Sequence, residues 1–150
     1  MCCIGKTKSP ELRATISDYL KRLSHYTEVE LAELSDAQGV RDIKSVPSLE
    51  EQIFVKKIQK APYFILDEKG QVHDSLSFSA FIQKQRNTGR KYLFLVIGGA
   101  HGFSNAFKSA AAGSIALSAL TFPHDLVRLI LLEQLYRAHT ILAGEKYHHE

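Results

Sequence analysis

Side chains that can move protons or hold anions gather near the carboxyl end of this 150-residue chain. Tyr147 and His148 follow Gly144, a residue type that favours the end of a helix, so we expect them in a tail that can swing over another part of the molecule. Arg137 precedes them in a long apolar stretch. An arginine in such a place is either a paired structural ion or a ligand for phosphate or carboxylate.

Other kinds of site are poorly supported. The terminal run His148-His149-Glu150 invites a metal-binding interpretation, but adjacent residues cannot easily aim three ligands at one ion, and no Cys or His pair at i, i+4 supports them. We therefore expect no metal. The chain also lacks the G-x-S-x-G motif of serine hydrolases and the spacing of a phosphate-binding P-loop.

A glycine cluster forms the second chemical feature. Gly98, Gly99 and Gly102 follow the apolar run at 92–97 and precede Ser104, a good helix N-cap. Ligands in open α/β sheets bind outside the carboxyl ends of strands, where glycine lets backbone amides approach them. A tight turn is an equally good explanation for these glycines. The dinucleotide fingerprint G-x-G-x-x-G is absent, because Ala100 stands where it needs a glycine.

Strands and helices alternate along the chain. Six consecutive apolar residues at 92–97 predict a central parallel strand covered on both faces. Helix caps are expected at Ser9, at Ser48 with Glu51, at Asp74 or Ser75, and at Ser104 or Asn105. The other predicted elements are strands at 1–4, 28–34, 63–67 with a turn at 68–70, and 115–122, a mobile loop at 35–47, and a helix at 125–143. This order predicts a parallel sheet with helices on both faces.

The helix at 125–143 is apolar over most of its circumference. A helix of this kind must be buried by more than its own sheet, so we expect a homodimer in which a second copy covers it. For Arg128, within the same helix, we favour a structural ion pair over a ligand-binding role.

Bulk properties fit one cytoplasmic domain spanning 1–150. The net charge of +3 and the isoelectric point near 8.8 permit a nucleic-acid partner, and the densest basic patch is formed by Arg86, Arg90 and Lys91. The neighbouring residues Cys2 and Cys3 are poorly placed to bridge each other, which favours a reducing compartment. No stretch is long and apolar enough for a membrane span.

Four motifs in order resemble one known family. FLVIGGAHGF at 94–103, LSALTFPH at 117–124, LVRLILLEQLYRA at 126–138 and KYHHE at 146–150 are similar to motifs of the pseudouridine-N3 23S rRNA methyltransferases of the SPOUT superfamily. The resemblance implies a three-layer α/β/α sandwich with a mainly parallel sheet. It also implies a C-terminal trefoil knot and a homodimer formed through the last helix.

The resemblance further implies a substrate, a cofactor and a site. The substrate is a pseudouridine of 23S rRNA in the ribosome, methylated at N3 by S-adenosyl-L-methionine. Tyr147, His148 or Arg137 would promote loss of the N3 proton. The adenosine pocket would comprise Leu66, Gly98, Leu117, Ser118, Ala119, Leu120, Thr121 and Phe122. The alternatives are a non-catalytic RNA-binding or ribosome-assembly protein with the same fold and, less favoured, a nucleotide-binding oxidoreductase.

Overall fold

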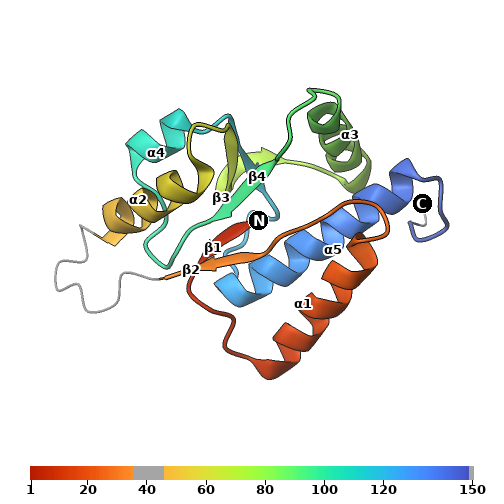
Figure 1. The fold of residues 1–150 in the computed structure, drawn as a ribbon, viewed down its shortest axis with the longest axis horizontal. Coiled ribbons are helices and arrows are strands. Elements are labelled where there is room, and N and C mark those ends of the chain that lie inside the picture. Colours follow the sequence, from red (N-terminus) through yellow and green to blue (C-terminus); the bar gives the residue numbers. More distant parts are fainter. Residues whose placement is uncertain (36–45, 149–150) are drawn as a thin grey trace.

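The computed structural model describes residues 1–35 and 46–148 (Figure 1). Most of the predicted loop at 35–47, and the tail residue His149, lie outside the described residues. The strands are β1 (Cys2–Ile4), β2 (Ala32–Leu34), β3 (Tyr63–Val72), β4 (Phe94–Ile97) and β5 (Gly113–Ala116). The helices are α1 (Pro10–Leu23), α2 (Val46–Ile58), α3 (Ser75–Arg86), α4 (Asn105–Ala110) and α5 (His124–Leu142). None of the described helices is long and apolar enough to cross a membrane.

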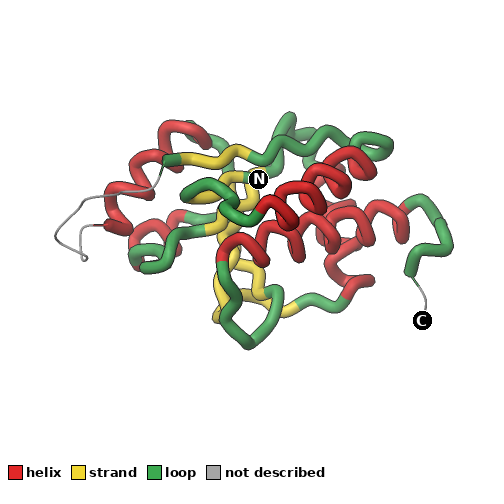
Figure 2. Tube along the Cα trace, turned by 90° about the horizontal axis from the view of Figure 1, so that it is seen from below, coloured by secondary structure: helices red, strands yellow, loops and turns green. Residues whose placement is uncertain are grey.

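All pairings in the sheet are parallel, with the strand order β2-β1-β4-β3-β5. The apolar run predicted as the central strand is β4, whose side chains point alternately to two cores. Leu95 and Ile97 pack with residues of α1, α3 and α5, whereas Val96 packs with residues of α2 and α4. The predicted three-layer arrangement is therefore confirmed, and Figures 1 and 2 show a helical layer on each face of the sheet.

Several strand boundaries differ from prediction. Strand β2 begins at Ala32, four residues later than predicted, and β4 begins at Phe94, two residues later than predicted. The strand expected at 115–122 is β5, which begins at Gly113 and leaves the sheet after Ala116, where a turn forms as Leu120 N donates to Ser118 Oγ at 3.0 Å. The turn expected at 68–70 is absent, because β3 continues to Val72 beyond an irregular register with β5. Gly70 permits this, since a Cβ there would lie 2.7 Å from Ser114 C and Ile115 N. The trefoil knot stays a prediction from the resemblance.

Helix caps are as predicted at three helices and wrong at one. Ser9, Asp74 and Ser104 accept hydrogen bonds from Leu12 N, Ser77 N and Phe107 N. Helix α2 begins at Val46, ahead of Ser48, so the predicted capping box at Ser48 and Glu51 does not form there. Glu51 instead binds Ser104 at the start of α4.

Arg128 joins α5 to the end of β1. The residue is 1% exposed, and its guanidinium donates to Ile4 O at 2.7 Å, to Gly5 O at 3.1 Å and to Thr7 Oγ1 at 2.8 Å. The carboxylates of Glu33 and Asp125 lie 3.2 Å and 3.3 Å from Nη1. The structural role predicted for this arginine is confirmed, and these contacts fix the start of α5 beside the carboxyl edge of the sheet.

Candidate functional site

A cavity of about 440 Å³ opens at the carboxyl ends of β4 and β5, beside the middle of β3. Residues 66–68 of β3, the glycine loop after β4 and the segment between β5 and α5 form its walls. This is the position at which open parallel sheets bind ligands, because the loops that leave neighbouring strands diverge there.

The cavity brings together nearly all the residues expected to bind a cofactor. Ala119 is the exception: it is exposed and does not line the cavity, although both of its neighbours do. The seven predicted residues that line it are Leu66, Gly98, Leu117, Ser118, Leu120, Thr121 and Phe122. Residues 52 positions apart in sequence, Leu66 and Ser118, thus meet at one site.

Two glycines of the loop after β4 lie too close to neighbouring side chains to carry a side chain of their own. A Cβ on Gly98 would lie 3.0 to 3.2 Å from the ring of Phe103, and one on Gly99 would lie 2.6 Å from a carboxylate oxygen of Glu50. Gly102 has φ +65, the left-handed region that favours glycine. The turn explanation therefore applies at Gly102, and close packing against Phe103 and Glu50 accounts for Gly98 and Gly99. Approach of a ligand to this loop stays a prediction.

An ion pair forms part of the cavity wall. The carboxylate of Asp67 accepts a hydrogen bond from Lys108 Nζ and another, of 2.9 Å, from Lys69 N. Burial opposes ionisation of Asp67, but these hydrogen bonds hold its pKa below the ordinary value. The wall thus carries a paired, ionised carboxylate. Nothing in the sequence pointed to Lys108 as the partner of Asp67.

The three residues predicted to act on the acceptor base lie together at the other end of α5. Arg137 Nε and Nη2 bind Glu133 Oε1 at 3.1 and 2.5 Å, and the guanidinium lies 4.9 Å from the ring centroid of Tyr147. His148 Nδ1 is 3.5 Å from Arg137 Nη1, and Tyr147 Oη is 3.3 Å from Glu133 Oε1. We call these four residues the tail cluster. Glu133 was missed as a member, although its i, i+4 spacing from Arg137 is typical of a helical ion pair.

The tail cluster is separated from the cavity of the same chain. The cavity includes His124 and Val127 at the beginning of α5, whereas Arg137 lies ten residues farther along, about 15 Å at the helical rise. Tyr147 packs edge-to-face on Tyr136 at 4.9 Å, so the tail folds back on its own helix and does not swing over the cavity as expected. Figure 2 shows the tail leaving the far end of α5.

Three further histidines lie in the cavity or in the core. His101 and His124 line the cavity, whereas His139 is buried and stacks on Tyr26. Over residues 1–35 and 46–148, no group of three or more His, Cys, Asp or Glu side chains could hold a metal ion.

The cavity suits a flat, uncharged ring with a polar edge. Leu66, Ile115 and Leu117 supply apolar wall, while the glycine loop and the turn at Ser118 bring backbone close to the opening. These features are typical of α/β proteins that bind a nucleoside-like ligand at the carboxyl ends of their strands.

Comparisons with known proteins agree with this class. The family described as "Predicted SPOUT methyltransferase" matches residues 1–148, and the chain belongs to this family. A protein of Christiangramia forsetii named "Ribosomal RNA large subunit methyltransferase H" is 43% identical over 152 residues, with 99% of this chain and 97% of the relative covered. The protein of the same name from Parabacteroides distasonis is 40% identical over 150 residues, covering 98% and 96%.

One solved structure supports the fold alone. It is described as a putative RNA methyltransferase from Bacillus anthracis and aligns with a TM-score of 0.51, covering 99% of this chain and 98% of that chain. The sequence identity is only 12%, so the likeness concerns architecture.

Proposed function

We propose that this protein is an S-adenosyl-L-methionine-dependent methyltransferase that acts on N3 of a pseudouridine in 23S rRNA of the large ribosomal subunit. One observation carries the proposal. In a chain about 40% identical over its whole length to rRNA large subunit methyltransferases, seven of the eight residues expected to bind the cofactor line one cavity.

The cavity is where the adenosine would be held. Leu66 and Leu117 would contact its faces, and the backbone of the glycine loop and of the 118–122 segment would bind its polar edge. The cofactor supplies a methyl group already activated on a sulfonium, which requires no metal. The task of the protein is to align donor and acceptor and to exclude water.

The tail cluster supplies the acceptor side of the reaction. N3 of the base is an imide nitrogen that must lose its proton before it can attack. Arg137, oriented by Glu133, would stabilise the resulting negative charge. Burial, together with hydrogen bonds that involve Tyr19 and Glu133, raises the pKa of Tyr147. Tyr147 therefore stays protonated near neutral pH and donates a hydrogen bond, and His148 is the better group to receive the N3 proton.

The separation of the two half-sites favours a homodimer. If a second copy packs with its α5 antiparallel to the first, the tail cluster of each copy reaches the cavity of the other. The half-buried apolar side chains of α5, among them Leu126, Leu129, Ile130 and Ile141, are available for such a contact. The active unit would be a cytoplasmic homodimer of one-domain chains that requires neither metal nor membrane.

Two measurements test the proposal. Calorimetry should show binding of S-adenosyl-L-methionine and no binding of NAD. Incubation of the protein with ribosomes and methyl-labelled cofactor should place the label on a pseudouridine of 23S rRNA. A protein that binds ribosomes but transfers no methyl group would instead be the non-catalytic RNA-binding or assembly factor.

A further inference from the structure

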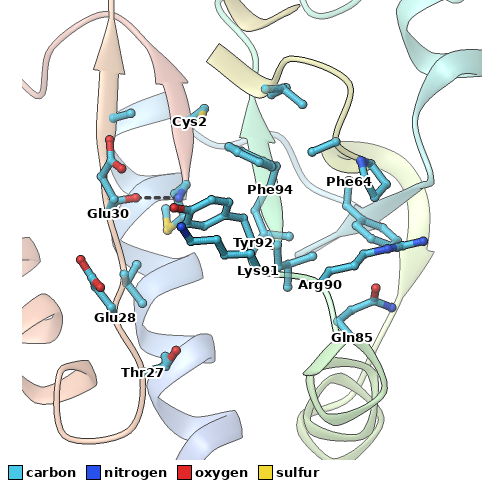
Figure 3. Close-up of a pocket in the computed structure, with 18 of the residues that line it drawn as sticks. Cys2, Thr27, Glu28, Glu30, Phe64, Gln85, Arg90, Lys91, Tyr92 and Phe94 are labelled. Atoms are coloured by element: carbon cyan, nitrogen blue, oxygen red, sulfur yellow. Dashed lines mark hydrogen bonds between the residues drawn. The ribbon is translucent and has the colours of Figure 1, made fainter. Parts of the chain in front are cut away.

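A larger groove lies at the opposite edge of the sheet from the cofactor cavity. Its volume is about 970 Å³, and it is bounded by the amino ends of β1, β3 and β4, by the segment before β2 and by the carboxyl ends of α2 and α3 (Figure 3). None of the residues assigned to the cofactor or to the tail cluster lines it. The groove is therefore a separate feature that the proposed methyl transfer does not use directly.

The rim of the groove is strongly cationic. Lys57 is paired with Glu30 at 2.7 Å. Four other cationic side chains line the groove and form no ion pair with any residue in the described part of the chain: Lys60, Arg86, Arg90 and Lys91. Among the described residues that line the groove, Glu28 is the only carboxylate without an ion pair. All four cations are exposed. A rim with this excess of unpaired positive charge attracts a polyanion.

Aromatic and apolar side chains lie between these charges. Tyr92 is 58% exposed, with Lys91 Nζ 5.2 Å from its ring centroid and the Phe94 ring 6.0 Å away. Figure 3 shows Lys91 and Tyr92 extending toward β1 and β2, and Arg90 extending in the opposite direction, toward the side of the groove where Phe64 lies. An exposed ring among cations is the combination that binds single-stranded nucleic acid, because bases stack on the ring while the cations contact phosphates.

The groove leads toward the tail cluster. His139 forms part of its lining and stacks on Tyr26 with ring centroids 5.9 Å apart and an interplanar angle of 18°. Tyr26 contacts Tyr136 at 5.9 Å, and Tyr136 contacts Tyr147 at 4.9 Å. A continuous series of rings thus connects the groove to the residues proposed to meet the target base.

We infer that this groove is the docking surface for the rRNA strand that flanks the target pseudouridine. The inference rests on the proposed function, because it assigns a surface to the same RNA substrate. Arg86, Arg90, Lys91 and Lys60 contact phosphates, and Tyr92 stacks on a base. The strand then passes to the tail cluster of the same protomer, which presents the target base to the cofactor cavity of the second copy.

The test compares two variants with equal changes in net charge. The groove variant carries Arg86→Glu, Arg90→Glu and Lys91→Glu. The control variant carries Lys84→Glu, Lys56→Glu and Arg13→Glu at positions that are exposed and do not line the groove. Lys84 is a close match for Arg86, because both lie in the last turn of α3.

Binding of ribosomes and of a labelled single-stranded RNA oligonucleotide is measured against salt concentration. Loss of three phosphate contacts should reduce the steepness of the plot of log binding constant against log salt concentration by about 2, relative to the control variant. At low salt, the groove variant should bind RNA on the order of 10²-fold more weakly than the control variant. In methylation assays the KM for ribosomes should rise while the affinity for S-adenosyl-L-methionine is unchanged. If the groove variant is poorly folded, substitution of the same three residues by Gln should give the same change in slope.

Equal slopes and equal KM values for the two variants would overturn the inference. A second result would also overturn it. If the wild-type protein binds inorganic phosphate, the groove variant does not, and the salt dependence of RNA binding is the same for both, the groove is a site for a free anion. Failure of the proposed function is a different result. It appears as no methyl transfer by the wild-type protein, whereas the groove is judged by binding isotherms that need no turnover.

Discussion

The carboxylate of Glu51 accepts hydrogen bonds from both donors of Ser104, the backbone N–H and the side-chain hydroxyl. Ser104 N donates to Glu51 Oε1 at 2.5 Å, and Ser104 Oγ donates to Glu51 Oε2 at 2.8 Å. The same hydroxyl accepts from Phe107 N as the N-cap of α4. One side chain of α2 therefore fixes the point at which the glycine loop ends and α4 begins.

Substitution of Glu51 by Ala should loosen this loop. The variant loses two hydrogen bonds to a charged acceptor, and we expect the free energy of unfolding to fall by about 1–3 kcal/mol. Affinity for S-adenosyl-L-methionine should fall as well, because the loop forms one wall of the cavity. Chemical denaturation and calorimetry measure the two effects. Gln52→Ala at the exposed neighbouring position is the control, and wild-type cofactor affinity in the Glu51→Ala variant would show that the contact only stabilises the fold.

Substitution of Arg128 by Met should be far more damaging to stability. The arginine is buried and contacts two backbone carbonyls, Thr7 Oγ1 and two carboxylates, and each of these groups would lose the contact with the guanidinium. Removal of one partner from a buried ionic network typically costs about 3–5 kcal/mol. Urea denaturation checks this value. Arg13→Met, at an exposed position of α1, should change the free energy of unfolding by less than about 0.5 kcal/mol.

The sequence predicted the central strand, the parallel sheet and three helix caps because these depend on local patterns. Six apolar residues identify β4, and Ser9, Asp74 and Ser104 have side chains suited to N-caps. The continuation of β3 was missed because Glu68, Lys69 and Gly70 read locally as a turn. Their extended conformation depends on pairing with β5, a contact between segments far apart in sequence.

For the candidate site, too, some features could be predicted from the sequence and others could not. The family resemblance named eight residues for the cofactor, and the structure brings seven of them together at one cavity. Partners that lie far away in sequence had no local signal: Lys108 for Asp67 and Glu51 for Ser104 are 41 and 53 residues apart. The position of the tail against its own α5 was likewise not predictable, because it depends on ring contacts with Tyr136.

Acid should destabilise the protein in two stages. Burial, with Arg86 nearby, lowers the pKa of His139 below its ordinary value of 6.5. Between that value and the folded-state pKa the unfolded chain binds more protons, so stability falls as the pH falls from 6.5. Glu33 is partly buried, but hydrogen bonds from Thr7 lower its pKa from 4.5. Its contribution is present above pH 4.5 and is lost as the pH falls through the folded-state pKa.

A His139→Gln variant separates the two stages. Urea denaturation at a series of pH values should show that the free energy of unfolding of the variant depends less on pH below 6.5 than that of the wild type. Below pH 4.5, where Glu33 titrates, both proteins should lose stability equally. The loss of stability below pH 4.5 serves as the internal control. An unaltered dependence near pH 6 in the variant would mean that His139 does not titrate differently in the folded and unfolded protein.

Changes in the tail cluster should affect turnover without affecting cofactor binding. His148→Ala should reduce methyl transfer to ribosomes by roughly 10²-fold or more, the loss typical of a missing general base. Tyr147→Phe should have a smaller effect, because the ring contact with Tyr136 is retained and only the hydroxyl is lost. Single-turnover rates and calorimetry measure the two quantities. Equal losses of stability and turnover for His148→Ala would identify a packing residue.

The last prediction tests whether two chains share each active site. Gly98→Val disrupts the cofactor cavity, because a side chain there forces the Phe103 ring to move. Arg137→Ala disrupts the tail cluster. Each variant alone should be inactive in methyl transfer, while circular dichroism verifies that both are folded.

When the Gly98→Val and Arg137→Ala proteins are mixed and allowed to exchange subunits, about half of the dimers contain one chain of each kind. In such a dimer, one site combines the intact cavity of one chain with the intact tail of the other, and the second site carries both defects. The mixture should therefore recover about one quarter of wild-type methyl transfer, since one of two sites works in half of the dimers. A mixture that stays inactive although mass spectrometry detects mixed dimers would place the cavity and the working tail in the same chain.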